Sequence, residues 1–270
     1  MAAPTARALT IASSDSGGGA GIQADLKTFA ALGVYGASAI TALTAQNTQG
    51  VAGIFNVPAD FVARQIDVVF ADLAVGAVKT GMLSSADIIE AVARALVRHK
   101  AANVVVDPVM VASSGDALLA QDAVGALRRL LIPRALIVTP NLAEAAALSG
   151  TRIARNENEM EAQARLVLKL GARNVLIKGG HGDGAESVDL LVGEGATLRL
   201  AARRIDTANT HGTGCTLSAA IAAGLAKGDH LVAAVRAAKD YVTGAIAAAD
   251  RLQAGRGAGP LHHFYRWWET

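Results

Sequence analysis

Short apolar segments alternate with helix-length segments along the whole chain, and this alternation limits the fold more than any other feature. Segments 8–14, 103–110 and 135–141 have the composition of strands, and amphipathic stretches such as 85–100 separate them. Strands at helix-length intervals indicate βαβ units, whose strands run parallel. Runs such as Val104–Val106 are apolar throughout, as expected when helices cover both faces of a sheet. The sequence therefore predicts an α/β fold with a mostly parallel central sheet between two helical layers.

Two segments break the parallel pattern. Residues 47–58 (NTQGVAGIFNVP) predict a small flap hairpin, and residues 187–205 predict a second hairpin that turns at 193–195. No Pro/Ser-rich linker and no change of composition divides the 270 residues. We therefore expect a single domain, 1–270.

Charge and cysteine content exclude several classes of protein. The 25 basic and 23 acidic residues leave a net charge of +2 without a Lys/Arg cluster, so nucleic acid is not expected as a partner. The single cysteine excludes an internal disulfide and is typical of a reducing compartment, which predicts a cytoplasmic protein. No apolar run reaches the roughly 18 residues of a membrane span, and the apolar stretch after Arg7 is too short for a signal peptide.

Polar or glycine residues follow one predicted strand after another. The carboxyl ends of parallel strands meet at one edge of a sheet, and ligands bind there. We therefore predict a ligand site at that edge, made from Asp15 and Ser16, Gln46 and Asn47, Lys79 to Gly81, Asp107 and Pro108, Thr139 to Asn141, and Lys178 to Gly180.

Two common nucleotide-binding motifs do not account for this edge. The dipeptide GK is absent, which excludes a Walker A motif. Residues 19–24 match G-x-G-x-x-A, but neutral Gln46 stands near the position where a dinucleotide site needs an acid. A nicotinamide-dependent oxidoreductase is therefore a weak alternative. The glycines are better explained as a loop that lets a ligand approach the backbone.

The only cysteine, Cys215, lies at the start of a long apolar helix, directly after two glycines. The free N–H groups and the positive dipole end of such a helix form an anion site at 212–215. The same field predicts that Cys215 ionises more readily than a free cysteine. A glycine-capped turn with an inert buried cysteine is the structural alternative.

Several segments together resemble the ribokinase-fold vitamin kinases, and most closely the hydroxymethylpyrimidine/phosphomethylpyrimidine kinases of bacterial thiamine synthesis. They are SDSGGGAGIQADLKT (14–28), TALTAQNT (41–48), GAVKTGML (76–83), VVVDPVM (104–110), TPNLAEAAALSG (139–150), HGTGC (211–215) and GPLHHFYRWW (259–268). The resemblance implies a ribokinase-like three-layer fold and a kinase that uses ATP and Mg²⁺. It implies phosphorylation of 4-amino-5-hydroxymethyl-2-methylpyrimidine and then of its monophosphate.

Cys215 stands where related sugar kinases have aspartate, which directs the resemblance to pyrimidine and pyridoxal kinases. Pyridoxal or pyridoxine kinase on the same scaffold is the first alternative. A non-catalytic pyrimidine- or nucleotide-binding protein is the second, and the presence of Asp107 and Lys178 as well as Cys215 argues against it. A homodimer is expected, with the aromatic tail at 264–268 docked on its own domain or across the dimer.

The resemblance assigns roles to the residues at matching positions. It implies catalytic roles for Gly212, Thr213, Gly214, Cys215 and Lys178, with the amides of Thr213 and Gly214 on the γ-phosphate. It implies contacts with the pyrimidine from Gln46, Asp25, Gly21, Met82 and Val109. It implies contacts with the nucleotide from Asp107, Asn141, Glu144, Lys178, Thr213 and Gly214, and it makes Asp107 and Glu144 the ligands of Mg²⁺.

These assignments compete with ordinary structural roles. Asn141 and Glu144 also fit a helix cap, and Asp25 also fits a carboxylate near a helix start. Met82 and Val109 also fit the core. Gln46 and Lys178 also fit solvent-facing positions.

Overall fold

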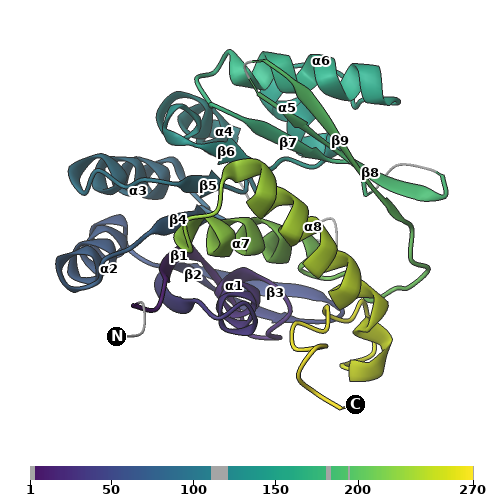
Figure 1. Ribbon diagram of the computed structural model, residues 1–270. Helices are drawn as coiled ribbons and strands as arrows, with labels where there is room; N and C mark the ends of the chain where they lie inside the picture. Colours follow the sequence, from purple (N-terminus) through teal and green to yellow (C-terminus); the bar gives the residue numbers. More distant parts are fainter. Residues whose placement is uncertain (1–3, 111–120, 181–183, 194, 270) are drawn as a thin grey trace.

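The computed structural model describes residues 4–110, 121–180, 184–193 and 195–269, and within them the strands form one nine-stranded sheet (Figure 1). The strand order is β3-β2-β1-β4-β5-β6-β7-β8-β9. The strands from β2 to β7 pair in parallel, whereas β3, β8 and β9 join through antiparallel pairs. Their bounds are β1 (Arg7–Asp15), β2 (Tyr35–Asn47), β3 (Gly50–Asn56), β4 (Ala77–Thr80), β5 (Val104–Val106), β6 (Ile137–Val138), β7 (Val175–Lys178), β8 (Glu186–Val192) and β9 (Thr197–Arg203).

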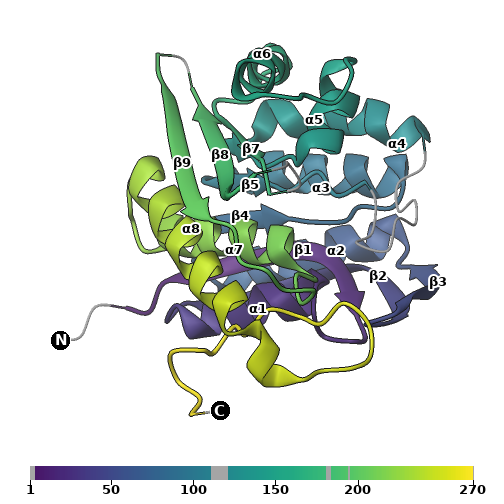
Figure 2. The ribbon, with the colours of Figure 1, turned by 90° about the vertical axis from the view of Figure 1, so that its right-hand side faces the viewer.

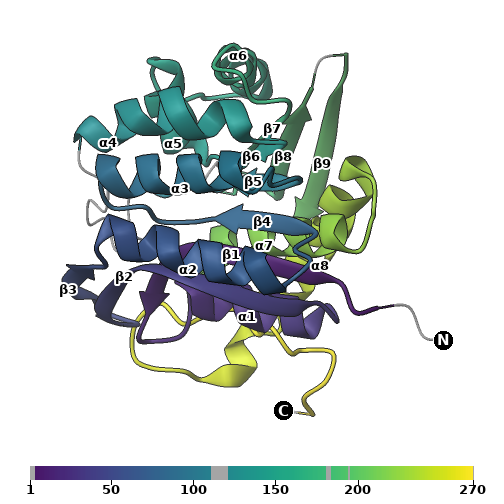
Figure 3. The same cartoon turned by 90° about the vertical axis from the view of Figure 1, so that its left-hand side faces the viewer.

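Helices cover both faces of this sheet, and each helical layer encloses its own apolar core. One layer, which faces the viewer in Figure 3, holds α2 (Ala59–Asp72), α3 (Ala86–Arg98), α4 (Gln121–Ala126), α5 (Leu142–Ser149) and α6 (Glu157–Leu168). The other, seen in Figure 2, holds α1 (Gly21–Ala31), α7 (Thr213–Ala226) and α8 (Leu231–Ala247). Short π- and 3₁₀-helical turns cover Leu127–Leu131, Ile132–Arg134 and Ala249–Leu252. In the described segments, none of these helices has the length and hydropathy of a membrane span.

The predicted three-layer α/β architecture is confirmed, and so are both predicted hairpins. The flap hairpin consists of the end of β2 and β3, with Leu43 opposite Phe55 and Gln46 opposite Val51. The second hairpin pairs β8 with β9 along their whole length. Because β3 forms the outer edge of the sheet, the flap extends the sheet beside the carboxyl end of β1.

The alanine-rich helix α7 packs tightly between the sheet and its neighbouring helices. Ten consecutive residues, Thr216–Leu225, are buried. A Cβ atom at Gly224 would lie 2.9 Å from Cβ of Ala234 in α8, so the small side chains let the two helices approach closely. This packing holds the first turn of α7 against the carboxyl edge of the sheet.

The C-terminal tail docks on its own domain, as one of the two predicted arrangements requires. Leu261 and His263 are buried, and the Tyr241 hydroxyl of α8 donates to the carbonyl of His263 at 2.8 Å. The tryptophans do not belong to the buried part of the tail, because Trp267 is 68% exposed and Trp268 is 51% exposed.

Candidate active site

The first turn of α7 presents unpaired amides. Gly212 adopts a left-handed conformation (φ 83°) just before the helix, where a side chain would be strained. The Thr213 amide is already used, because it donates to the carbonyl of Thr210 at 3.2 Å. The amides of Gly214 and Cys215 have no acceptor among the described residues. The unpaired amides that the prediction requires are therefore present at Gly214 and Cys215, whereas the Thr213 amide is used within the turn.

A buried ion pair lies next to this turn. Lys178, at the end of β7, places Nζ 2.9 Å from Oδ1 of Asp107, the residue that follows β5. A Cβ atom at Gly214 would lie 3.1 Å from that Nζ and 3.7 Å from Oδ2 of Asp107. Ser218 and Thr139 each donate to the Asp107 carboxylate at 3.2 Å. Three residues predicted from separate strand ends and a helix start are thus brought together.

Glu144 and Asn141 have a structural role as well as a place at this cluster. Asn141 caps α5: its side chain accepts from the Glu144 amide at 2.9 Å, and the Glu144 carboxylate accepts from the Asn141 amide at 2.7 Å. The capping box holds Oε2 of Glu144 3.9 Å from Nζ of Lys178. The helix-cap alternative is therefore correct for both residues, and it orients Glu144 toward Lys178.

The charges of the cluster shift one another's pKa values. Burial and the nearby Asp107 carboxylate raise the pKa of Glu144 to about 7, despite Lys178. Burial alone would raise the pKa of Asp107, but the ammonium groups of Lys178 and Lys79 hold it below its usual range. Burial would lower the pKa of Lys178, but Asp107 and Glu144 raise it. At neutral pH the cluster therefore contains one fixed cation, one fixed anion and one carboxyl that titrates.

The donor set suits magnesium bound together with phosphate. Asp107 and Glu144 supply two carboxylates at one edge of the sheet. Within the described ranges no group of three or more His, Cys, Asp or Glu side chains could hold a metal alone. Mg²⁺ commonly takes one or two carboxylates and completes its shell with waters and substrate phosphates. The residues present fit that mode of binding.

Cys215 does not have the low pKa that its helix position predicts. Burial raises the pKa of its thiol to about 11, although Lys79 lies close enough to oppose this shift. The Gly21 amide donates to the thiol, which places the start of α1 beside Cys215. The prediction of a readily ionised thiol is therefore wrong, because desolvation outweighs the helix dipole. At neutral pH Cys215 is a protonated thiol.

Asp25 lies in a completely buried ion pair with Lys79 of β4. Lys79 donates to both carboxylate oxygens, at 2.8 and 2.9 Å, and Thr10 donates to the carboxylate at 2.5 Å. Burial would lower the pKa of Lys79, but Asp25 and the nearby Cys215 and Asp107 raise it. The carboxylate predicted to contact the pyrimidine is therefore already paired with a buried ammonium group.

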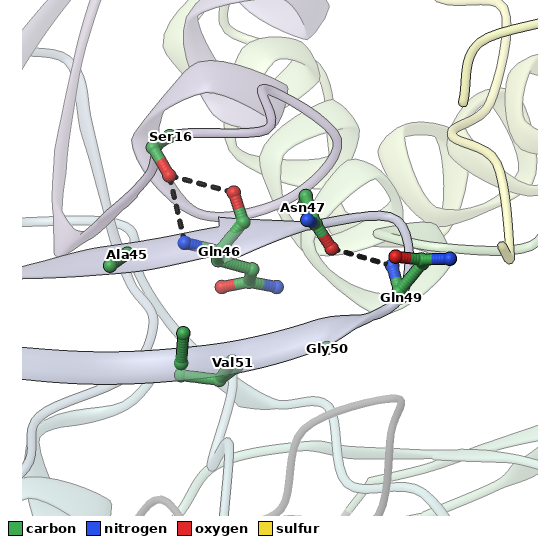
Figure 4. Close-up of a pocket in the computed structure, with 8 residues that line it drawn as sticks. Ser16, Ala45, Gln46, Asn47, Gln49, Gly50 and Val51 are labelled. Atoms are coloured by element: carbon green, nitrogen blue, oxygen red, sulfur yellow. Dashed lines mark hydrogen bonds between the residues drawn. The ribbon is translucent and has the colours of Figure 1, made fainter. Parts of the chain in front are cut away.

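Gln46 lies at the end of β2 on the wall of an open cavity of about 720 Å³ lined by Ser16, Ala45, Gln46, Asn47, Gln49, Gly50, Val51 and Ala52 (Figure 4). The Ser16 hydroxyl accepts from the backbone N–H of Gln46 at 2.8 Å and donates to the backbone carbonyl of Gln46 at 2.7 Å. In Figure 4 these bonds lie on one side of β2, and the Gln46 side chain projects to the other side. Ser16 thus fixes the backbone while the side-chain amide faces the cavity region.

The remaining predicted pyrimidine contacts lie at the same edge of the sheet. Met82 follows β4 and is buried, and its carbonyl accepts from Thr41 of β2. Val109 follows β5 and is half-buried. Gly21 begins α1 with φ 56°, and a Cβ atom there would lie 2.3 Å from the Ser13 carbonyl oxygen. Glycine is therefore required where the loop after β1 passes Cys215.

Asp15, which the sequence places at the ligand edge, is paired with His211, a residue without a predicted role. The Asp15 carboxylate accepts from the amides of Gly17, Gly19 and Ala20, and it lies 2.9 Å from Nε2 of His211. A Cβ atom at Gly19 would lie 2.4 Å from the His211 ring. The position of Asp15 after β1 was a usable signal, but nothing in the sequence pairs it with a histidine 196 residues later.

A second cavity borders the same group of residues. It measures about 340 Å³ and is lined by Gln46, Asn47, Thr48, Gln49, Gly50, His211, Arg256, Gly257 and Ala258. Gln46 therefore stands between two cavities, and His211 lines one of them.

Comparisons with known proteins identify the family of this chain. The sequence profile of the phosphomethylpyrimidine kinase family matches residues 15–262. A hydroxymethylpyrimidine/phosphomethylpyrimidine kinase of Rhizobium meliloti is 61% identical over 98% of this chain and 99% of its own. Among solved structures, phosphomethylpyrimidine kinase of Clostridium difficile has a TM-score of 0.80 at 45% identity, over 90% of this chain and 100% of its own. Bacillus subtilis pyridoxal kinase, solved as an ADP complex, has a TM-score of 0.89 at 40% identity, over 96% and 98%. The chain belongs to the phosphomethylpyrimidine kinase family.

Proposed function

We propose that this protein uses ATP to phosphorylate 4-amino-5-hydroxymethyl-2-methylpyrimidine, and then the resulting monophosphate, in thiamine biosynthesis. The observation that carries the proposal is the meeting of Gly214, Lys178 and Asp107 at the start of α7, in a chain of this kinase family. Unpaired amides, a buried ammonium group and a carboxylate are the parts that phosphoryl transfer needs.

The anion site receives the γ-phosphoryl group of ATP. The amides of Gly214 and Cys215 donate to its oxygens, and Lys178 neutralises charge that builds up as the bond to ADP breaks. Lys178 is well placed for this role, because Asp107 holds its Nζ beside Gly214. ATP therefore lies with its phosphates between α7 and the carboxyl ends of β5 and β7.

Mg²⁺ supplies charge neutralisation on the ATP phosphates when it is bound. Asp107 and Glu144 are the carboxylates that would hold it, directly or through water. The capping box keeps Glu144 pointed at this position, and the pKa of about 7 means that its negative charge develops as the pH rises to neutral.

Cys215 contacts the hydroxymethyl group of the acceptor in this proposal. With a pKa of about 11 the thiol is not a base in the ground state. Phosphoryl transfer passes through a loose transition state, so the acceptor hydroxyl loses its proton late and positioning dominates. The thiol therefore orients the hydroxyl, and Gln46 binds the pyrimidine edge through its amide.

Pyridoxal kinase activity is the second candidate, and the high TM-score with a pyridoxal kinase favours keeping it. A coupled assay of ADP release separates the candidates. We expect a higher kcat/KM for the aminopyrimidine alcohol than for pyridoxal. A higher value for pyridoxal would reverse the assignment, and binding without ADP release would make the protein a non-catalytic binder.

We further propose that the flap hairpin is where a homodimer forms. Leu43, Ile54 and Phe55 are 43 to 69% exposed on neighbouring strands, and β3 is an edge strand. Exposed apolar side chains on a sheet edge favour association. Sedimentation of the wild-type chain and of Phe55→Ser tests this, since the substitution is expected to shift a dimer toward monomer.

A further inference from the structure

Three side chains from distant parts of the chain meet beside the proposed pyrimidine site. Nε2 of His211 lies 2.9 Å from Oδ2 of Asp15 and 3.4 Å from the side-chain amide of Gln46. Asp15 ends β1, Gln46 lies near the end of β2, and His211 precedes α7. His211 is 8% exposed and Asp15 is 3% exposed, so water competes little for their hydrogen bond.

The surroundings of Asp15 decide which atom of His211 carries a proton. The Asp15 carboxylate accepts from three loop amides, at 2.8 to 3.1 Å, as an ionised carboxylate does. A carboxylate oxygen can only accept, so the ring nitrogen that faces it must donate. Nε2 of His211 therefore carries a proton, and it presents an N–H group to both Asp15 and Gln46.

The same reasoning determines how the Gln46 amide is turned. The carbonyl and amino ends of a glutamine amide have nearly the same shape, and the hydrogen-bond network decides between them. One end lies 3.4 Å from Nε2 of His211, and the other lies 3.0 Å from the Thr44 hydroxyl. An amino group would face the His211 N–H donor to donor, whereas the carbonyl end accepts from it.

Thr44 requires the same orientation. Its hydroxyl has one proton, which it donates to the carbonyl of Ser14 at 2.9 Å, so it can only accept from Gln46. The amino end of Gln46 satisfies it. In this orientation the Gln46 carbonyl faces His211 and its amino group faces Thr44. Every donor in the hydrogen-bond network that runs from Asp15 through His211, Gln46 and Thr44 to Ser14 then has an acceptor.

We propose that His211, oriented by Asp15, is a specificity-determining residue that fixes the Gln46 amide in this orientation. The inference rests on the proposed function. The Gln46 carbonyl retains a lone pair for the exocyclic amine of the substrate, and its amino group retains one N–H for the adjacent ring nitrogen. The 4-oxo analogue of the substrate presents the opposite pattern, an acceptor followed by an N–H donor. A fixed amide rejects that analogue, and an amide free to turn accepts it.

The test is the ratio of kcat/KM for the 4-amino alcohol to that for the 4-oxo alcohol. We expect a ratio of at least roughly 100 for the wild-type enzyme, since two mismatched hydrogen bonds each cost about tenfold or more. His211→Leu removes the donor and is expected to lower the ratio below roughly 10. His211→Gln retains an N–H₂ group near the same place and is expected to restore most of the preference.

The outcomes separate this inference from the proposed function. A wild-type enzyme that turns over neither alcohol contradicts the proposed function. A wild-type enzyme that prefers the 4-amino alcohol, together with a His211→Leu variant that loses both rates equally and keeps the ratio, overturns the role of His211 alone. If the leucine variant does not fold, the ratio of His211→Gln and the ¹⁵N spectrum of wild-type histidine still decide. The spectrum must show a protonated Nε2, and an unprotonated Nε2 in the folded protein overturns the inference.

Discussion

Nζ of Lys178 lies 2.9 Å from Oδ1 of Asp107, and a Cβ atom at Gly214 would meet both side chains. Two strand ends and a helix start therefore meet at the place that we propose for the phosphoryl group. Asp107 holds the ammonium group of Lys178 beside Gly214 in the first turn of α7. Binding a phosphate there replaces water with groups that are already oriented.

Lys178→Met tests the role of the cation. We expect kcat to fall roughly 100- to 1,000-fold, because the transition state loses a preorganised charge. The variant also leaves Asp107 buried without its nearest cation, so thermal stability must be measured in parallel. Lys169→Met, at the exposed C-terminal cap of α6, is the matched control and should retain normal activity. Equal kcat values for the two variants would contradict the proposal.

Gly214→Ala tests the approach of the phosphate to the helix start. The added methyl group would lie 3.1 Å from Nζ of Lys178, in the space assigned to phosphoryl oxygens. We expect kcat/KM for ATP to fall at least roughly tenfold, with little change in Tm because alanine favours helices. Gly195→Ala, where a Cβ atom would have no neighbour within 4 Å, serves as the control. Unchanged ATP kinetics would place the phosphate elsewhere.

Glu144 gives stability a dependence on pH. Its pKa is about 7 in the folded protein and about 4.5 in the unfolded chain, so between these values the folded state binds more protons. The free energy of unfolding therefore falls as pH rises from about 4.5 to 7, by on the order of 3 kcal/mol from this group. Glu144→Gln preserves the capping box and should remove that slope. Urea titrations at pH 5, 6, 7 and 8 measure it, and an identical slope in both proteins would refute the assignment.

Cys215 should react slowly with alkylating reagents. Only the thiolate is nucleophilic, and with a pKa of about 11 the thiolate is scarce at neutral pH. We expect the rate of reaction with iodoacetamide to keep rising up to about pH 11. Since Cys215 is the only cysteine, mass spectrometry of the intact chain reports it directly. A plateau near pH 8 would mean that the helix dipole outweighs burial after all.

Asp25→Asn distinguishes a structural carboxylate from one that binds substrate. The substitution leaves Lys79 completely buried without its counter-charge, which commonly costs about 3 to 5 kcal/mol. The double variant Asp25→Leu with Lys79→Met removes both charges and should regain most of the stability. Denaturation curves measure this. A normal free energy of unfolding in Asp25→Asn, with a raised KM for the pyrimidine, would favour the substrate role instead.

The sequence predicted the parts of this molecule that depend on local pattern. Periodicity was sufficient for the layers and both hairpins, and the rule that parallel strands end at one edge placed Asp107 near Lys178. Helix-start chemistry predicted unpaired amides within 212–215, and those of Gly214 and Cys215 are unpaired among the described residues. Each of these inferences needs only neighbouring residues and a general property of sheets or helices.

Features that depend on tertiary contact were not predictable in this way. Lys79 and Asp25 are 54 residues apart, and no local sequence pattern indicates that they form an ion pair. The pKa of the Cys215 thiol is determined by burial more than by its position at a helix start, and burial cannot be inferred from the segment HGTGC. The role of His211 depends on its contact with Asp15 at the start of the loop after β1, and this contact joins residues that are far apart in the sequence.

The contact between the loop after β1 and the start of α7 also determines when the site can fold during synthesis. A Cβ atom at Gly212 would lie 1.9 Å from the carbonyl oxygen of Gly19, so two glycines 193 residues apart in the sequence touch backbone to backbone. During synthesis, a ribosome has to deliver more than three-quarters of the polypeptide before the first loop meets this partner. Long-range contacts of this kind slow folding and prolong the exposure of unfinished surfaces. Nascent chains that stop before residue 211 would therefore lack a formed acceptor pocket, however complete their sheet.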